Sequence, residues 1–370
     1  MATAIRNQMT NVLVAAFIYL TFGWINKNFA ITQIETTWWS FSILLILFDF
    51  LFYWFHRYGH SINILWAAHM PHHTSEEFNL FVGVRASITQ RLFSFSFMWP
   101  LAIIGFSARD IYTASAVQLI LAFWHHTKII GKMPGFEIIF NSPSYHRVHH
   151  AINDKYLDKN FGEIFIIWDK MFGTCAEEDE PVIYGALTPI KSWNPNKIYI
   201  HYFWILMQDA LKTKSWWDKF RLWFMPLGWR PKDVQHIDRG IINENTIEKF
   251  KSPMFRNLKP YIIIHLLFGL WTMFLVITPS IGFSNLERLT LAAFVWAMIT
   301  SWGGLLEAKN WARIFEPIQI GALCTYLIYL FNNHQKFLFT QNFIMAFALI
   351  SIAWVLFLLK QPMITSVQES

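Results

Sequence analysis

The feature that most constrains this chain is the stretch HRYGHSINILWAAHMPHH, which carries His56, His60, His69, His72 and His73. Residues three or four apart on a helix share one face. His56 and His60 can therefore direct two imidazoles at one point, and His69 can do so with His72 or His73. Neutral imidazole is the commonest protein ligand for mid-row transition metals. The spacing thus predicts a metal site.

A second histidine cluster lies further along the chain, where HRVHH carries His146, His149 and His150. His126, in FWHHTKII, follows an apolar run and is predicted to reach the same face. Its neighbour His125 points about 100° away on a helix and is predicted to be structural or to support a ligand. Nine imidazoles are too many for one ion. They suffice for two ions with four or five ligands each, and they leave open positions for a small molecule.

Three residues are candidates to support the ligands, because a ligating imidazole needs an acceptor for its second ring nitrogen. Asp49 lies inside an apolar run, where an unpaired carboxylate is costly, and it precedes His56 by two helical turns. Asp169, in IIWDKMFGT, and Asn160, in DKNFGE, are candidates for the same role. A helix cap or a surface ion pair explains Asp169 nearly as well. The remaining histidines have no partner at ligand spacing and are predicted to be structural: His201, His236, His265 and His334.

Composition places the chain in a membrane. Of its 370 residues, 54% are hydrophobic, 18% are aromatic and 15% are charged, against roughly 25% charged in an ordinary soluble domain. The net charge of +6 favours contact with an anionic membrane surface over nucleic acid, because no basic stripe with interleaved aromatic residues is present. Cys175 and Cys324 are too few and too far apart for a disulfide framework or a CxxC site.

Apolar runs that are long enough to cross, or nearly cross, a bilayer core of about 20 helical residues predict an all-α polytopic integral membrane protein. The first run has no signal-peptidase site after it and is predicted to be retained. The third and fourth are short and joined by Gly105–Asp110, so a hairpin that enters and returns without crossing is an alternative for them. The runs are 9–25, 38–56, 90–106, 111–124, 259–279, 286–303, 316–332 and 340–359.

Basic residues next to the ends of these runs set the orientation, since the more positive side faces the cytoplasm. With a cytoplasmic N-terminus, most of them fall on the cytoplasmic side, and that side carries every histidine cluster. A cytoplasmic, histidine-rich di-metal domain is therefore expected. Three regions follow, namely an N-terminal span and loop at 1–37, the di-metal domain with its membrane helices and cytoplasmic cap at 38–258, and a C-terminal four-helix transmembrane region at 259–370.

The segment TKSWWDKFRLWFMPLGW at 213–229 sets Trp and Phe beside Lys and Arg. An interfacial helix at a membrane surface has this pattern. A water-soluble helix packed against the metal domain has it too, and the sequence leaves both alternatives open.

The patterns HxxxH, HxxHH and a later HxxHH, at the ends of membrane helices, resemble those of the fatty acid hydroxylase/sterol desaturase superfamily of membrane non-haem di-iron enzymes. Within it, DFLFYWFHRYGH at 49–60, WAAHMPHHTSEEFNL at 66–80 and NSPSYHRVHHAINDKYLDKNFGEIFIIWDKMFGT at 141–174 look like alkylglycerol monooxygenases, the branch that cleaves glyceryl ethers. The resemblance covers about residues 38–230. The words DKNFG and WDKMFGT make it more specific than histidine spacing alone.

The resemblance implies that two iron ions use O2 to hydroxylate a membrane lipid at the carbon beside its ether oxygen, and that the hemiacetal formed collapses to an aldehyde and a glycerol derivative. No Rossmann, Walker, CxxCH or GxSxG motif is present. Electrons would therefore come from a partner protein or a small reductant, and the family implies tetrahydropterin. The eight histidines of the two clusters match the family's iron-binding motif, and His126 matches an extra histidine that many members have.

Two alternative functions stay open at this point. One is a fatty-acyl or sterol hydroxylase or desaturase that uses the same two irons. The other, from a different class, is a non-catalytic membrane protein that binds metal or haem, because paired histidines on membrane helices also bind haem.

Overall fold

The computed structural model describes residues 2–235, 248–334, 340–361 and 363–365, and nearly all of its regular structure is helical, as predicted. The chain divides into two compact units, and the division passes through the start of helix α9. The first unit comprises Thr10–Ile190 and Tyr199–Glu248, and the second comprises Ala2–Met9, Lys191–Ile198 and Lys249–Ser370.

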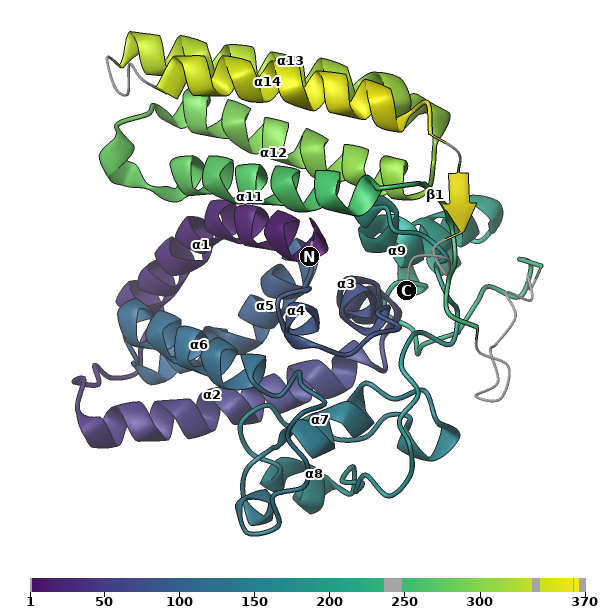
Figure 1. Cartoon of the computed structure of the whole chain (residues 1–370). Coiled ribbons are helices and arrows are strands. Elements are labelled where there is room, and N and C mark those ends of the chain that lie inside the picture. The colour runs from purple at the N-terminus through teal and green to yellow at the C-terminus, as the bar shows by residue number, and fades with distance from the viewer. Residues whose placement is uncertain (1, 236–247, 335–339, 362, 366–370) are drawn as a thin grey trace. The chain divides into compact units, whose positions relative to one another are not determined.

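The helices up to residue 235 include short 3-10 turns, η1 (Phe136–Ile138) and η2 (Asp154–Tyr156), around the second histidine cluster. The α-helices of this part, coloured purple to teal in Figure 1, are α1 (Ala2–Phe29), α2 (Trp38–Gly59), α3 (Asn63–His73), α4 (Leu80–Gly83), α5 (Ile88–Ile104), α6 (Ala108–Phe123), α7 (Pro143–His149), α8 (Ile167–Phe172), α9 (Pro195–Lys212) and α10 (Trp216–Arg221).

Helix α2 is the centre of the first unit, and it packs against α5 and α6. The contact buries apolar side chains such as Leu44, Leu101 and Ile111. A capping box starts α2, because Thr37 Oγ1 accepts a hydrogen bond from the Ser40 amide at 3.1 Å and Ser40 Oγ accepts one from the Thr37 amide at 2.8 Å. The α5–α6 hairpin turns at Gly105, whose φ of 128° and closeness to the Thr32 backbone exclude a side chain.

The second unit is a bundle in which each helix packs on the next along the chain. A buried carboxylate in such a bundle is costly unless it is paired. Glu316 accepts hydrogen bonds from the Tyr261 hydroxyl at 2.8 Å and the Gln319 amide at 3.1 Å. The elements are β1 (Pro253–Phe255), α11 (Leu258–Ile277), η4 (Pro279–Ile281), α12 (Asn285–Leu306), α13 (Asn310–Asn333), α14 (Thr340–Leu358) and β2 (Met363–Thr365), which pairs antiparallel with β1.

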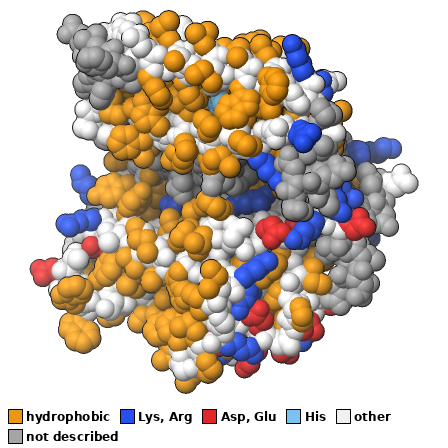
Figure 2. Space-filling model, in the orientation of Figure 1, with side chains coloured by type: hydrophobic (Ala, Val, Ile, Leu, Met, Phe, Trp, Pro, Cys, Tyr) orange, Lys and Arg blue, Asp and Glu red, His pale blue; other side chains and the backbone are white. Residues whose placement is uncertain are grey.

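Within the described residues, 5 helices are long and apolar enough to cross a membrane, namely α2, α11, α12, α13 and most of α14. They match the predicted runs at 38–56 and after residue 258. Exposed hydrophobic side chains cover the visible face of α11–α14 in Figure 2, as lipid contact requires. The protein is therefore an integral membrane protein. Helices α5 and α6 have 17 and 16 residues, whereas a full crossing needs about 20. Their lengths agree with the alternative in which they form a hairpin that enters the membrane and returns.

Two helical glycines of the second unit provide a matched pair for a stability test. A Cβ on Gly304 in α12 would lie 2.6 Å from the Trp311 ring and 2.7 Å from Ala312 Cβ, whereas at Gly321 in α13 the nearest atom is 3.8 Å away. We expect Gly304→Ala to destabilise the protein by about 1–3 kcal/mol through overpacking. Gly321→Ala should be neutral or stabilise by up to about 1 kcal/mol through helix propensity. Thermal unfolding in detergent compares them, and equal shifts would contradict this account.

Candidate metal centre

The structure gathers the nine histidines predicted as ligands into two groups, and within each group the nitrogen atoms lie within 4.8 Å of one another. The neighbours His72 and His73 go to different groups, because adjacent helical residues point about 100° apart. The first group is His56, His60, His69, His73 and His149, and the second is His72, His126, His146 and His150.

Four elements deliver these side chains. Helix α2 carries His56 in its last turn and is capped by His60. Helix α3 supplies three histidines, α7 supplies His146 and His149 with His150 as its C-cap, and His126 follows the end of α6. The two groups are in contact, since the His73 and His150 rings stack with their centroids 4.4 Å apart.

The spacing of the ring nitrogens fits metal ions. Two nitrogens that bind one ion at about 2.1 Å lie about 3.0–3.4 Å apart, depending on the angle at the ion. His69 Nε2 lies 3.0 Å from His56 Nε2 and 2.9 Å from His73 Nε2. His126 Nε2 lies 2.9 Å from His146 Nε2 and 3.4 Å from His72 Nε2. Both groups therefore have the separations of ligands that share an ion.

Unpaired ring nitrogens support the same conclusion. Within the described part of the chain, Nε2 of His60, His149 and His150 is buried and has no hydrogen-bond partner. Leaving such an atom unpaired costs about 1–3 kcal/mol. A bound cation on each group would satisfy them, so the donor set fits a pair of metal ions.

Backbone carbonyls orient three of the imidazoles. Phe161 O lies 2.8 Å from His56 Nδ1, Lys159 O lies 3.0 Å from His149 Nδ1 and Ala122 O lies 3.1 Å from His126 Nδ1. A carbonyl only accepts hydrogen bonds, so Nδ1 must carry the proton in each case. This leaves Nε2 as the nitrogen that can bind a metal.

Burial keeps the imidazoles neutral. It lowers the pKa of seven of them well below the usual value, and neighbouring histidines lower each pKa further, so these rings carry no proton charge at pH 7. The neutral form is the one that binds metal. The seven are His60, His69, His72, His73, His146, His149 and His150.

Asp49 acts on the loop that supplies the carbonyls. Its carboxylate accepts hydrogen bonds from the amides of Ile164 at 2.8 Å and Phe165 at 3.1 Å, and from Trp168 Nε1 at 2.9 Å. Gln118 donates a further bond at 3.3 Å. The acceptors for Nδ1 of His56 and His149 are thus carbonyls of this loop, and the Asp49 carboxylate holds the loop in place from inside α2.

Asp169 and Asn160 support the same loop from the other side. Asp169 accepts hydrogen bonds from the Phe161 and Gly162 amides at 2.8 and 2.7 Å. Burial raises its pKa, while hydrogen bonds oppose that shift. Asn160 donates to Tyr145 O at 3.0 Å and Ala176 O at 2.8 Å. Asp158, which the sequence analysis did not single out, lies 3.7 Å from His60 Nδ1.

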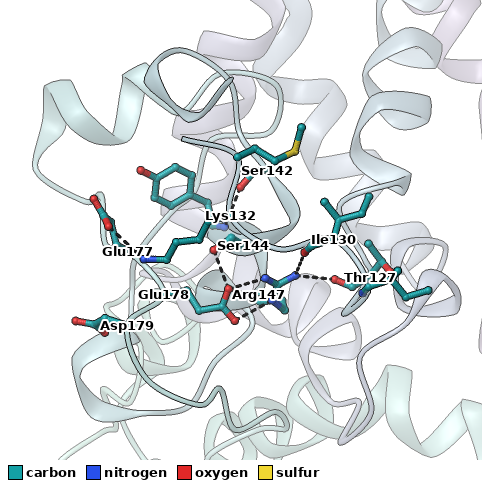
Figure 3. Close-up of polar contacts among 12 residues, drawn as sticks. Thr127, Ile130, Lys132, Ser142, Ser144, Arg147, Glu177, Glu178 and Asp179 are labelled. Atoms are coloured by element: carbon teal, nitrogen blue, oxygen red, sulfur yellow. Dashed lines mark hydrogen bonds and ion pairs between the residues drawn. The ribbon is translucent and has the colours of Figure 1, made fainter. Parts of the chain in front are cut away.

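An ion pair holds α7, the helix of the second histidine cluster, in place, as Figure 3 shows. Residue spacing in the sequence did not predict this pair. Arg147, between His146 and His149 in α7, donates to both carboxylate oxygens of Glu178, at 2.8 Å and 2.6 Å. Its other nitrogen donates to Thr127 O at 2.9 Å and Ile130 O at 2.7 Å, just after His126. The only sequence signal is an acidic run, EEDE at 177–180, and its partner cannot be read from spacing.

A cavity of about 650 Å³ borders the histidines. His60, His73 and His149 of the first group and His150 of the second line it. The volume lies in the range of small-molecule sites, about 300–1,000 Å³. Both groups are thus accessible from one space.

Known proteins resemble the chain over most of its length. The fatty acid hydroxylase family model matches residues 41–174. The alkylglycerol monooxygenase of Homo sapiens is 33% identical, over 87% of this chain and 72% of the relative. That of Danio rerio is 32% identical, over 95% of this chain and 78% of the relative. The chain belongs to the alkylglycerol monooxygenase family.

The family membership confirms the resemblance drawn from the histidine patterns. No solved structure matches the chain. Outside the two groups, His265 Nδ1 lies 2.8 Å from Tyr261 O and His334 Nε2 lies 3.0 Å from Glu287. His125 is buried and His201 lies in α9, and neither is in a group. His236 lies outside the described residues.

The Arg147–Glu178 pair gives a stability prediction for this family member. Glu178→Ala leaves the buried Arg147 without its carboxylate, at a cost of up to about 3–5 kcal/mol, because Glu178 itself is 20% exposed. The variant should unfold at a clearly lower temperature and bind less metal. Glu177→Ala is the control, because its side chain is 72% exposed and its pair with Lys132 lies at the surface. Thermal unfolding and metal analysis of both variants test this prediction. Similar losses of stability and metal in the two variants would show that the Arg147–Glu178 pair has no special role.

The grouping of the histidines predicts a metal count. His126→Ala removes one of the four histidines of the second group, so we expect metal analysis to find about one ion per chain, against about two expected in the unchanged protein. His125→Ala, at the neighbouring buried histidine outside both groups, should keep about two. Equal metal loss in both variants would argue against the assignment of His126.

Proposed function

We propose that this chain is a membrane monooxygenase that cleaves the ether bond of alkylglycerol-type lipids to an aldehyde and a glycerol derivative. The observation that carries the proposal is the exposure of both histidine groups to one cavity. The substrate class comes from the alkylglycerol monooxygenases that the chain resembles. The activity belongs to residues 38–258.

The metal in this proposal is iron, with one ion on each histidine group. Sets of imidazole ligands bind several transition metals, so the choice of iron rests on the family. Bound iron supplies the activation of O2 for attack on an unactivated C–H bond. One oxygen atom enters that bond and the other leaves as water, which consumes two electrons and two protons. A small reductant of the tetrahydropterin class is the proposed electron source.

The cavity positions the lipid. Part of the cavity wall is apolar and excludes water from an alkyl chain; it includes Ile152, Leu157 and Ile205. Arg230, ion-paired with Asp209, lines the same cavity and offers N–H donors to glycerol hydroxyls. A lipid held between these groups presents the carbon beside its ether oxygen to the histidine face.

The reaction ends without further oxidation. The hydroxylated carbon is a hemiacetal, so its C–O bond to glycerol breaks as the hydroxyl proton passes to the glycerol oxygen. The products are an aldehyde and a free hydroxyl. We propose that this reaction takes place at the cytoplasmic edge of the membrane, because basic residues next to the apolar runs are in excess on that side.

A direct test supplies purified protein in lipid vesicles with an alkylglycerol, O2 and a tetrahydropterin. We expect fatty aldehyde and glycerol in equal amounts, with ¹⁸O from ¹⁸O2 in the aldehyde after rapid trapping by reduction. His69→Ala and His149→Ala should abolish this product, because each removes a ligand of the first group.

Other outcomes of this test point to other functions. A hydroxylated fatty acid or sterol with no aldehyde would favour the hydroxylase alternative, and a new double bond without ¹⁸O would favour a desaturase. Active protein without any transition metal would end the proposal.

A further inference from the structure

Large aromatic side chains are exposed on α10 and the turn after it. Trp216 is 83% exposed, Trp217 63%, Phe220 60% and Phe224 57%. Apolar patches of this kind mark surfaces that contact a partner or a membrane. We call Trp204, Leu211, Trp216, Trp217, Phe220 and Phe224 the aromatic surface.

Helix α9 continues this surface on its outer face. Trp204 and Leu211 are 54% and 68% exposed, while Tyr202 and Ile205 on the inner face are buried. A water-soluble helix carries polar residues on its outer face. An apolar outer face therefore disagrees with the water-soluble alternative for this region and agrees with the interfacial one.

Hydrogen bonds fix the depth of the segment that follows α10. The Leu227 amide donates to Ser61 O at 2.9 Å, the Ile64 amide donates to Trp223 O at 2.9 Å and the Asn63 amide donates to Met225 O at 3.1 Å. Residues 61–64 follow α2, which among the described residues of this unit is the helix long and apolar enough to cross a membrane. With α2 across the bilayer, residues 223–227 lie at the end of that crossing, at the level of the lipid headgroups.

Basic residues accompany the aromatic ones at this level. Lys212 and Lys214 are exposed beside Leu211 and Trp216. Lys219 Nζ lies 5.6 Å from the centre of the Trp216 ring and donates to Ala210 O at 2.7 Å, which ties α10 to α9. Each Lys or Arg near an anionic membrane surface contributes about 1 kcal/mol of attraction. The charge and the rings together fit an anionic leaflet.

We propose that α9 and α10 form a membrane-surface element whose aromatic surface lies among the headgroups of an anionic leaflet, on the side of the bilayer where the histidines lie. Tyr202 and Ile205, on the inner face of α9, line the cavity that borders the histidines. The element therefore forms the membrane-facing wall of that cavity, and ether lipids reach it from the headgroup layer. This last step rests on the proposed function, whereas the position in the membrane does not.

The position of α9 and α10 at the membrane surface can be tested without an activity measurement. A nitroxide label on Trp217→Cys, in phosphatidylcholine vesicles with phosphatidylglycerol, should be accessible to O2 and shielded from a water-soluble nickel chelate. The same label on Glu177→Cys, at a side chain 72% exposed in the polar part of the unit, should be open to the chelate. Labelled protein without either substitution corrects for Cys175 and Cys324.

Two results of the labelling would overturn the proposal. Free access of the chelate to position 217 would show that the aromatic surface faces water. Shielding from both reagents would show that protein covers it, either the C-terminal helices or a second copy of the chain.

The route of the lipid is tested with two double variants. We expect Trp216→Ser with Trp217→Ser to raise the KM for a long-chain alkylglycerol in anionic vesicles on the order of tenfold, with kcat, metal content and turnover of a short water-soluble ether unchanged. Trp38→Ser with Trp39→Ser is the control, because these side chains are 89% and 82% exposed at the opposite end of α2. An unchanged KM, or equal changes in both variants, would overturn the route. Wild-type protein without oxygenase activity would instead refute the proposed function, while the labelling still decides the position.

Discussion

The structure depends on keeping nine neutral imidazoles buried and aimed at two points. An unpaired buried nitrogen costs about 1–3 kcal/mol, so each ring needs a partner on both sides. Carbonyls of Phe161, Lys159 and Ala122 take one side of three rings. The loop that contains Lys159 and Phe161 is held in turn by two buried carboxylates, Asp49 from a membrane helix and Asp169 from α8. Helix α2 and the histidine centre are therefore parts of one hydrogen-bonded framework.

Under the proposed function, the site lies at the membrane edge. The lipid substrate would be in the bilayer and the small reductant in water, and only the boundary is open to both. The end of α2 carries His56 and is hydrogen-bonded through residues 61–64 to the segment that follows α10. The same framework thus connects the histidine groups, the cavity wall and the aromatic surface.

Sequence reasoning succeeded where a pattern is local. Histidine spacing of three and four identified the ligand candidates, because a helix sets those distances by its period. It did not identify Arg147 and Glu178 as a pair, since thirty-one residues separate them and only folding brings them together. It expected carboxylates or amides beside the rings and not carbonyls, because backbone acceptors leave no trace in side-chain identity.

The sequence by itself determined a helical membrane protein with two histidine clusters, because hydropathy and helical period act through neighbouring residues. Tertiary structure alone decided that His72 joins His126 and His146 while His73 joins His56, since that division depends on how α2, α3 and α7 cross. It also decided the exposure of Trp216 and Trp217, on which our proposal of a membrane-surface element rests. That exposure is a matter of packing, which no local pattern encodes.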